Sequence, residues 1–181
     1  MKFEIWVDSD SFPENLRKIV LNRCYKNKIP VHFVADRELR DITAFYGKHT
    51  GKLRELKKGQ NPDLEDESLK EIKSWIQMHV VPVGSDSADD FIVENVKSGS
   101  LVITHDIPLA ARLLEKDAVV IDDRGGEFDK GTIKRRLSSR DVNMQLREWS
   151  VFFKEKNKEM GQRETREFSN AFDRECTKMG C

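Results

Sequence analysis

Short apolar runs rich in β-branched residues alternate along this chain with longer stretches whose apolar positions recur every three or four residues. The runs predict buried strands, and the stretches predict amphipathic helices. The expected strands are residues 3–7, 31–35, 80–83, 101–104 and 118–121. Because strands and helices alternate, we expect an α/β fold: a three-layer sandwich with a mainly parallel central sheet and helices on both faces.

The helix expected after the first strand has a clear apolar stripe and a clear start. Leu16, Ile19, Val20 and Cys24 recur at helical spacing. Ser11 and Glu14 stand three residues apart, which is the spacing of a capping box. A further helix is expected over residues 68–76, leading into the third strand.

Residues 37–70 interrupt the alternation and resemble an insertion. Between Arg37 and Lys58 there are seven basic and three acidic residues, and glycines recur through this segment. The pattern over residues 37–62 favours a mobile arm or a helix with loops.

A length of 181 residues suits one α/β domain with a small addition. We place the domain at residues 1–150, with the insertion at 37–70. Residues 151–181 are expected to form a charged connector and a C-terminal helix that packs on the same domain, because Phe168, Phe172 and Cys176 share one helical face.

Composition narrows the class of protein. Charged residues make up 35% of the chain and no apolar run is long enough to span a bilayer, so we expect a soluble protein with no membrane partner. The N-terminus lacks the pattern of a secretory signal. The three cysteines form no CxxC pair, which favours a reduced, cytoplasmic setting. A net charge of +0 leaves only local patches for nucleic acid, and a homo-oligomer is compatible with the sequence.

Aspartates gather after the predicted strands. Asp8, Asp36, Asp106 and Asp122 follow four of them, and Asp86 and Asp90 follow the third. Because parallel strands point their carboxyl ends to one edge of a sheet, we expect several of these side chains to meet there. Helix capping explains each carboxylate separately, but it does not require them to converge.

Converging carboxylates favour a divalent ion. The candidate ligands are Asp8, Asp10, Asp86, Asp90 and Asp106, of which Asp8, Asp90 and Asp106 are the catalytic candidates. Oxygen ligands without nearby thiolates suit Mg²⁺ or Mn²⁺ rather than zinc. Such an ion activates water and neutralises charge on phosphate oxygens, so phosphodiester hydrolysis is the expected chemistry, with RNA or single-stranded nucleic acid as substrate.

Basic residues near this edge are candidates for phosphate contacts. Arg124 lies in a glycine turn just after a predicted strand, and Arg140 ends a segment, residues 130–140, that has five basic and no acidic residues. A solvated helix face explains most of that segment equally well. Few aromatic residues are interleaved with the basic ones, so base stacking has little support.

The motifs together resemble a known family. WVDSDSFP, VVPVGSDSADDFIV, GSLVITHDIPLAARLLEK, DDRGGEF and RRLSSRDVNMQLR, in this order, are similar to the successive motifs of the bacterial YaiI/YqxD family, which is itself similar to PIN-like nuclease domains. The resemblance implies a PIN-like α/β fold with an acidic pocket. By motif match, Asp8, Asp90 and Asp106 fall on the PIN-like acidic positions, with Asp10 and Asp86 beside them. Most members of the family have no established activity.

The sequence departs from the family pattern in places. Asp8-Ser9-Asp10-Ser11-Phe12-Pro13 stands where the family has Asp-Ala-Asp-Ala-Cys-Pro, and Asp122-Asp123-Arg124-Gly125 replaces an Asn-Pro-Arg-Gly turn. None of these changes removes a carboxylate of the expected pocket.

Two other functions stay open. Asp8-Ser9-Asp10, Thr104, Lys116 and Asp122-Asp123 follow the order of the motifs of haloacid-dehalogenase-type phosphatases, in which Asp8 would be the nucleophile and Asp10 the acid and base. Ser11-Phe12 continues that motif poorly, and the pattern leaves Asp86 and Asp90 without a role. The other alternative is a non-catalytic module that binds RNA or a protein through the basic arm.

Overall fold

The structure is a computed structural model that describes residues 3–63, 65–82, 87–136 and 161–180. Its centre is a six-stranded sheet with the order β3-β2-β1-β4-β5-β6. The strands are β1 (Ile5–Asp8), β2 (Val31–Ala35), β3 (Ile76–Val80), β4 (Leu101–Ile103), β5 (Val119–Ile121) and β6 (Glu127–Phe128). All neighbouring strands pair in parallel except β5 and β6, which are antiparallel.

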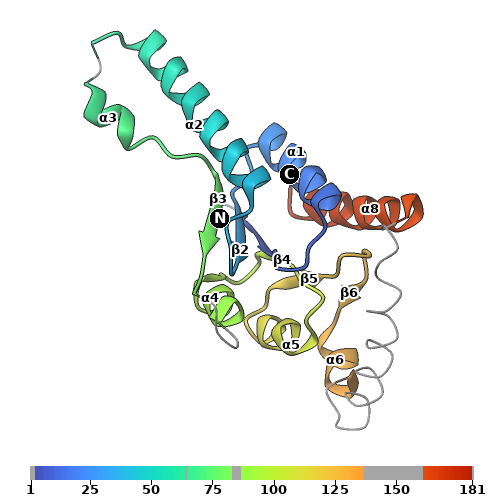
Figure 1. Ribbon diagram of the computed structural model, residues 1–181. Coiled ribbons are helices and arrows are strands. Elements are labelled where there is room, and N and C mark those ends of the chain that lie inside the picture. The colour runs from blue at the N-terminus through green and yellow to red at the C-terminus, as the bar shows by residue number, and fades with distance from the viewer. Residues whose placement is uncertain (1–2, 64, 83–86, 137–160, 181) are drawn as a thin grey trace.

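Helices cover both faces of this sheet, which confirms the expected three-layer α/β sandwich (Figure 1). The described helices are α1 (Glu14–Asn27), α2 (Arg40–Gln60), α3 (Asp66–Lys70), α4 (Ser87–Asn95), α5 (Ile107–Glu115), α6 (Lys130–Arg136) and α8 (Gln162–Lys178). Side chains of α1, α2 and α8 pack on one face, and side chains of α4, α5 and α6 pack on the other.

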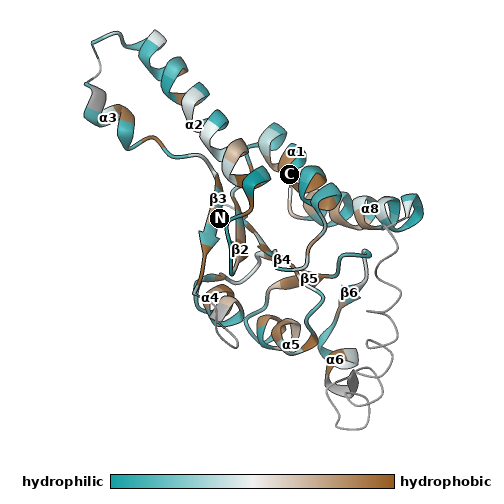
Figure 2. Ribbon diagram, in the orientation of Figure 1, coloured by the Kyte–Doolittle hydropathy of each residue, from teal (hydrophilic) through white to brown (hydrophobic). Residues whose placement is uncertain are grey.

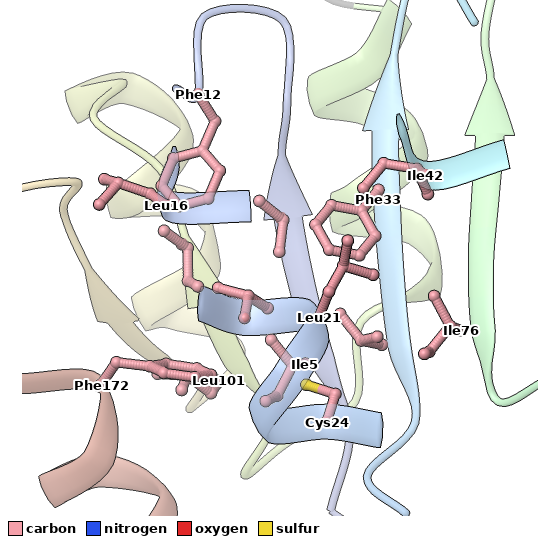
Figure 3. Close-up of a cluster of buried hydrophobic side chains, with 14 of the residues drawn as sticks. Ile5, Phe12, Leu16, Leu21, Cys24, Phe33, Ile42, Ile76, Leu101 and Phe172 are labelled. Carbon is pink, nitrogen blue, oxygen red and sulfur yellow. The ribbon is translucent and has the colours of Figure 1, made fainter. Parts of the chain in front are cut away.

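The alternation of side chains along the strands produces two separate hydrophobic cores. Ile5 and Val7 of β1 face the helices α1 and α8, whereas Trp6 between them faces α4 and α5. Figure 3 shows the first core, in which Phe33 and Leu21 lie between the sheet and α1. Burial of these side chains stabilises the fold, because each fully buried large aliphatic or aromatic side chain contributes about 1.5–3 kcal/mol.

Several predicted elements are correct and others are wrong. The second strand has the predicted bounds, residues 31–35. The third strand is Ile76–Val80 rather than 80–83, because the residues that pair with β2 begin at Ile76. Consequently no helix reaches residue 76, and α3 ends at Lys70. The short strand β6 was not predicted, since two residues give no periodic signal.

The predicted capping box at the start of α1 is also wrong. The N-cap residue is Pro13, and no side chain caps the helix there. The hydroxyl of Ser11 instead lies 3.1 Å from Nε2 of His105. The apolar stripe of this helix is confirmed, since Leu16, Val20 and Cys24 are buried.

The segment expected as a mobile arm or a helix with loops is mainly one continuous helix, α2, which extends away from the sheet (Figure 1). Aromatic contacts hold the middle of this helix. His49 forms a 2.7 Å hydrogen bond with Ser74, and its ring packs edge-on against Trp75 with the ring centroids 4.1 Å apart. The distal end of α2 is mostly hydrophilic (Figure 2), and its residues are exposed from Arg54 onward. The rule of 1.5 Å per residue makes a helix of this length about 30 Å long.

The C-terminal helix α8 packs beside α1, and Phe168 and Phe172 on it are fully buried. The turn between β5 and β6 also lies against this helix, because a Cβ on Gly125 would come within 2.7 Å of the Glu167 carbonyl oxygen. No helix in the described part of the chain is both long enough and apolar enough to cross a membrane.

Candidate functional site

The carboxyl ends of the adjacent strands β1 and β4 bring Asp8 and Thr104 into contact. The hydroxyl of Thr104 donates a 2.8 Å hydrogen bond to Oδ2 of Asp8. The same hydroxyl oxygen accepts a 3.0 Å hydrogen bond from the backbone N–H of Asp106. Thr104 is buried, so this pair of hydrogen bonds fixes both the Asp8 carboxylate and the start of the following loop.

Two further aspartates at this edge are held by backbone N–H groups. Asp106 is the N-cap of α5, and its Oδ1 accepts a 2.7 Å hydrogen bond from the N–H of Leu109. Oδ1 of Asp10 accepts a 2.7 Å hydrogen bond from the N–H of Asp36, which follows β2. Each carboxylate is therefore oriented by a donor that uses only one of its oxygens.

The charges of Asp10 and Asp106 both act on the carboxyl of Asp8. Burial raises the pKa of the Asp8 carboxyl, and the charges of Asp10 and Asp106 raise it further. The hydrogen bond from Thr104 and the nearby His105 lower that pKa and partly oppose the rise. Burial also raises the pKa of Asp10, with a contribution from the charge of Asp36. Ionisation of Asp8 is thus less favourable than ionisation of an exposed aspartate.

Asp122 adds a further carboxylate at the carboxyl edge of the sheet, just after β5. Its Oδ1 accepts hydrogen bonds from the N–H groups of Arg124 and Gly126, at 2.8 Å and 2.7 Å. Burial nevertheless raises the pKa of this carboxyl, and the charge of Asp123 adds to the rise. From the sequence, Asp122 was one of the aspartates that follow predicted strands, but it was not among the candidate metal ligands.

Asp90 forms an ion pair that joins two helices. Oδ1 of Asp90 lies 2.5 Å from Nη2 of Arg112, and this ion pair joins α4 to α5. Asp90 is half-exposed and is not among the groups that shift the pKa of Asp8. Asp90 therefore lies on the side of α4 that faces α5.

The remaining predicted residues differ in how far the structure describes them. Arg124 is exposed in the turn between β5 and β6, close in sequence to the edge that carries Asp122. Asp86 and Arg140 lie outside the described residues.

The sequence placed Ser11 in a capping box and did not predict its contact with His105. The Ser11 hydroxyl lies 3.1 Å from Nε2 and 3.4 Å from Nδ1 of the His105 ring, across 94 residues of sequence. No local pattern could have signalled this contact, because it depends on the pairing of β1 with β4.

Within the described ranges, no group of three or more His, Cys, Asp or Glu side chains is arranged to hold a metal ion.

Comparison with known proteins gives the family. The model of the family described as "Uncharacterized BCR, YaiI/YqxD family" matches residues 64–178. The chain belongs to the YaiI/YqxD family. No solved structure matches this member at a significant level.

Relatives of this YaiI/YqxD member extend over nearly the whole chain. A UPF0178 protein of Pseudomonas entomophila is 31% identical over 175 residues, which cover 97% of each chain. A UPF0178 protein of Bordetella petrii is 34% identical and covers 94% of this chain and 93% of its own. One from Xanthomonas campestris is 36% identical over 144 residues, 80% of this chain and 72% of the relative. None of these names states an activity.

Proposed function

We propose that this YaiI/YqxD protein is a divalent-metal-dependent nuclease that hydrolyses phosphodiester bonds of RNA or single-stranded nucleic acid at the carboxyl edge of its sheet. The observation that carries the proposal is the placement of Asp8. Its carboxyl is partly buried, its pKa is raised by that burial, and the charges of Asp10 and Asp106 add to the cost of ionising it. The fold does not require an ionisable group at this position. Groups with perturbed pKa values are enriched at functional sites.

Asp8 and Asp106 each have a carboxylate oxygen that could bind Mg²⁺ or Mn²⁺. Oδ1 of Asp8 and Oδ2 of Asp106 accept no hydrogen bond from residues in the described ranges, so each has an oxygen available for a ligand. Mg²⁺ is commonly held by only one or two carboxylates and several waters, and it does not require a cage of three protein ligands. Asp8 and Asp106 would hold the ion, with Asp10 beside them. When bound, such an ion supplies charge neutralisation at phosphate oxygens and an activated water.

The rest of the edge positions these groups. Thr104 holds the carboxylate of Asp8, and the N-terminus of α5 holds that of Asp106. Preorganised ligands of this kind lose little freedom when an ion or a phosphate arrives. Arg124 and Arg140 are the proposed contacts for the nucleic-acid backbone. Asp86 and Asp90 enter the proposal from the family resemblance and not from the geometry of the edge.

The phosphatase alternative is less well supported. The contact of Thr104 with Asp8 agrees with the phosphatase motifs, but the position of Lys116 does not. Lys116 follows the last turn of α5, a helix that starts at the carboxyl edge and returns to the opposite edge before β5. There its ammonium group donates to the carbonyl of Val93. A lysine at the opposite edge does not contact a phosphoryl group on Asp8.

The test compares wild-type protein with Asp8→Asn, Asp106→Asn and Asp90→Asn on labelled single-stranded RNA in Mg²⁺ or Mn²⁺. Asn at position 106 still caps a helix, so that variant keeps α5. We expect Asp8→Asn and Asp106→Asn to lower cleavage by about 100-fold or more. Asp63→Asn, an exposed carboxylate remote from the edge, is the matched control and should cleave like wild type.

Other outcomes decide between the alternatives. Hydrolysis of a phosphomonoester that is lost in Asp8→Asn but survives Asp90→Asn would favour the phosphatase. RNA binding without cleavage, unchanged by any of these aspartate variants, would leave the binding module that uses the basic arm of α2.

A further inference from the structure

The strand β3 forms one end of the sheet and leaves one side unpaired. The order of the strands places it next to β2 only, and in Figure 1 it lies at the outer side of the sheet. Its sequence, Ile76-Gln77-Met78-His79-Val80, contains no Lys, Arg, Asp, Glu or Pro. Edge strands usually carry such residues, because they discourage another strand from pairing there.

The register with β2 fixes which backbone groups of β3 point outward. Val31 donates its N–H to the carbonyl of Trp75, and Val81 donates to the carbonyl of Ala35. In a parallel ladder with this register, Gln77 and His79 direct their backbone groups toward β2. The backbone groups of Ile76, Met78 and Val80 therefore face away from the sheet.

These outward groups are mostly unpaired. The N–H of Ile76 donates to Oγ of Ser74 at 3.0 Å. Among the described residues, the N–H groups of Met78 and Val80 have no acceptor. The outward residues are spaced evenly about Met78, so the open edge is symmetrical about that residue.

The side chain at the end of the strand is unusually exposed for its type. Val80 has 54% of its surface exposed and is one of three large apolar residues in the described ranges that are exposed, with Tyr25 and Leu56. A β-branched side chain at an edge gains by burial against another strand.

We propose that β3 pairs with β3 of a second copy of the chain, antiparallel, about a two-fold axis at Met78. Each copy then donates the N–H of Met78 to the Met78 carbonyl of the other, and the N–H of Val80 to the Ile76 carbonyl of the other. The two sheets become one continuous sheet with closed two-fold symmetry.

The side chains favour a second copy as the occupant. In this register Val80 lies opposite Ile76 of the other copy, on the face that carries the larger core, so its exposed methyl groups become covered. Gln77 lies opposite His79 of the other copy on the second face, where an amide and an imidazole can form a hydrogen bond. Because the strand has no charged residue, two identical strands meet without repulsion.

A strand pair of this length forms a small interface, so we expect a reversible dimer with a dissociation constant of about 1–100 µM. Sedimentation equilibrium of the full chain should show a mass that rises from 21.0 kDa toward twice that value as concentration increases. A mass that stays at 21.0 kDa up to about 500 µM would overturn the proposal, as would assembly beyond a dimer.

Substitutions at exposed apolar positions locate the interface. Val80→Lys should weaken dimerisation by about 10-fold or more, since it places like charges at both ends of the paired strands. Val80→Thr keeps the β-branched shape and should retain most of the dimer. Leu56→Lys is the matched control, because Leu56 is 58% exposed on α2 and should have no effect. Equal loss in Leu56→Lys and Val80→Lys would contradict the assignment to β3.

Cross-linking tests the register and remains informative if Val80→Lys does not fold. Two Met78→Cys chains place their new thiols opposite each other across the axis, within the Cα separation that a disulfide allows. Oxidation should give a covalent dimer. In this register residue 77 lies opposite residue 79 of the other copy. Two Gln77→Cys thiols are therefore not opposite each other and should cross-link poorly. Wild-type protein, which contains Cys24, Cys176 and Cys181, is oxidised in parallel as the background. Equal cross-linking at positions 77 and 78 would overturn the register.

Discussion

The hydroxyl of Thr104 donates a 2.8 Å hydrogen bond to Oδ2 of Asp8, across 96 residues of sequence. The contact exists because β1 and β4 are neighbours in the sheet. It joins a threonine with no charge of its own to a carboxylate that is costly to bury. The remaining oxygen of Asp8 is left for a ligand, and the first two predictions follow from this arrangement.

Asp8→Asn should stabilise the protein near neutral pH. The folded-state pKa of Asp8 is raised by burial, so folding of the wild type loses stability as the pH rises from about 4 through that raised value. Asn removes this loss and still offers Thr104 an acceptor. We expect a gain of about 1 kcal/mol at pH 7 that shrinks toward pH 4. Denaturant unfolding at both pH values measures it, and a variant that is less stable at pH 7 would contradict the interpretation.

Mg²⁺ or Mn²⁺ should raise the melting temperature of wild-type protein. A ligand that binds only the folded state stabilises it by about 1.4 kcal/mol at ten times its dissociation constant, which corresponds to a shift of about 3–6 °C for a chain of this size. Asp8→Asn should abolish the shift, whereas Asp63→Asn should keep it. Differential scanning calorimetry with and without the ion, after removal of bound metal with a chelator, gives the comparison. An equal shift in Asp8→Asn would place the ion elsewhere.

A histidine pair on the second face of the sheet should make the fold sensitive to mild acid. Nδ1 of His32 lies 3.0 Å from Nε2 of His79, and the His32 ring stacks on Trp6. Burial lowers the pKa of His32 to about 4, and the charge of a protonated His79 would lower it too. The unfolded chain therefore binds the proton more readily, so stability is full above about pH 6.5 and falls as the pH drops toward 4.

His32→Phe tests this sensitivity, because it keeps an aromatic ring on Trp6 and removes the titrating group. We expect wild-type stability to fall by about 1 kcal/mol more than that of the variant between pH 7 and pH 4.5, after allowance for solvent screening of a partly exposed ring. Urea unfolding at several pH values measures the two slopes. Identical slopes would show that other groups dominate acid unfolding.

Gly125→Ala should destabilise the fold by about 2–3 kcal/mol. Gly125 has φ +82, and a Cβ there would meet the Glu167 carbonyl oxygen at 2.7 Å and Cβ of Ala171 at 2.9 Å. Gly99→Ala is the matched control: Gly99 has φ +80, but no atom lies within 4 Å of its added Cβ. It should cost only the backbone strain, about 1 kcal/mol. Equal effects would mean that α8 yields to the extra methyl group.

Local patterns predicted much of the fold but less of the site. The residues at 31–35 form a strand in the structure because they are an uninterrupted run of mostly apolar residues that is buried on both faces. The third strand was misplaced because the prediction looked for an uninterrupted apolar run. Gln77 and His79 interrupt such a run within the strand, whereas the valines at 80, 81 and 83 resemble one. The start of α1 was misassigned because Ser11 has a partner, His105, that is distant in sequence.

The sequence by itself determined the alternation of strands and helices, the two faces of each strand and the presence of an aspartate after several strands, since these depend on neighbours in the chain. Only the tertiary structure decided that Asp8 contacts Thr104 and that Asp90 pairs with Arg112. The reason is physical: which strand ends are adjacent depends on the order β3-β2-β1-β4-β5-β6, and that order is set by packing of the whole chain. The open side of β3 follows from the same order, because β3 stands at one end of it and has a neighbouring strand on one side only.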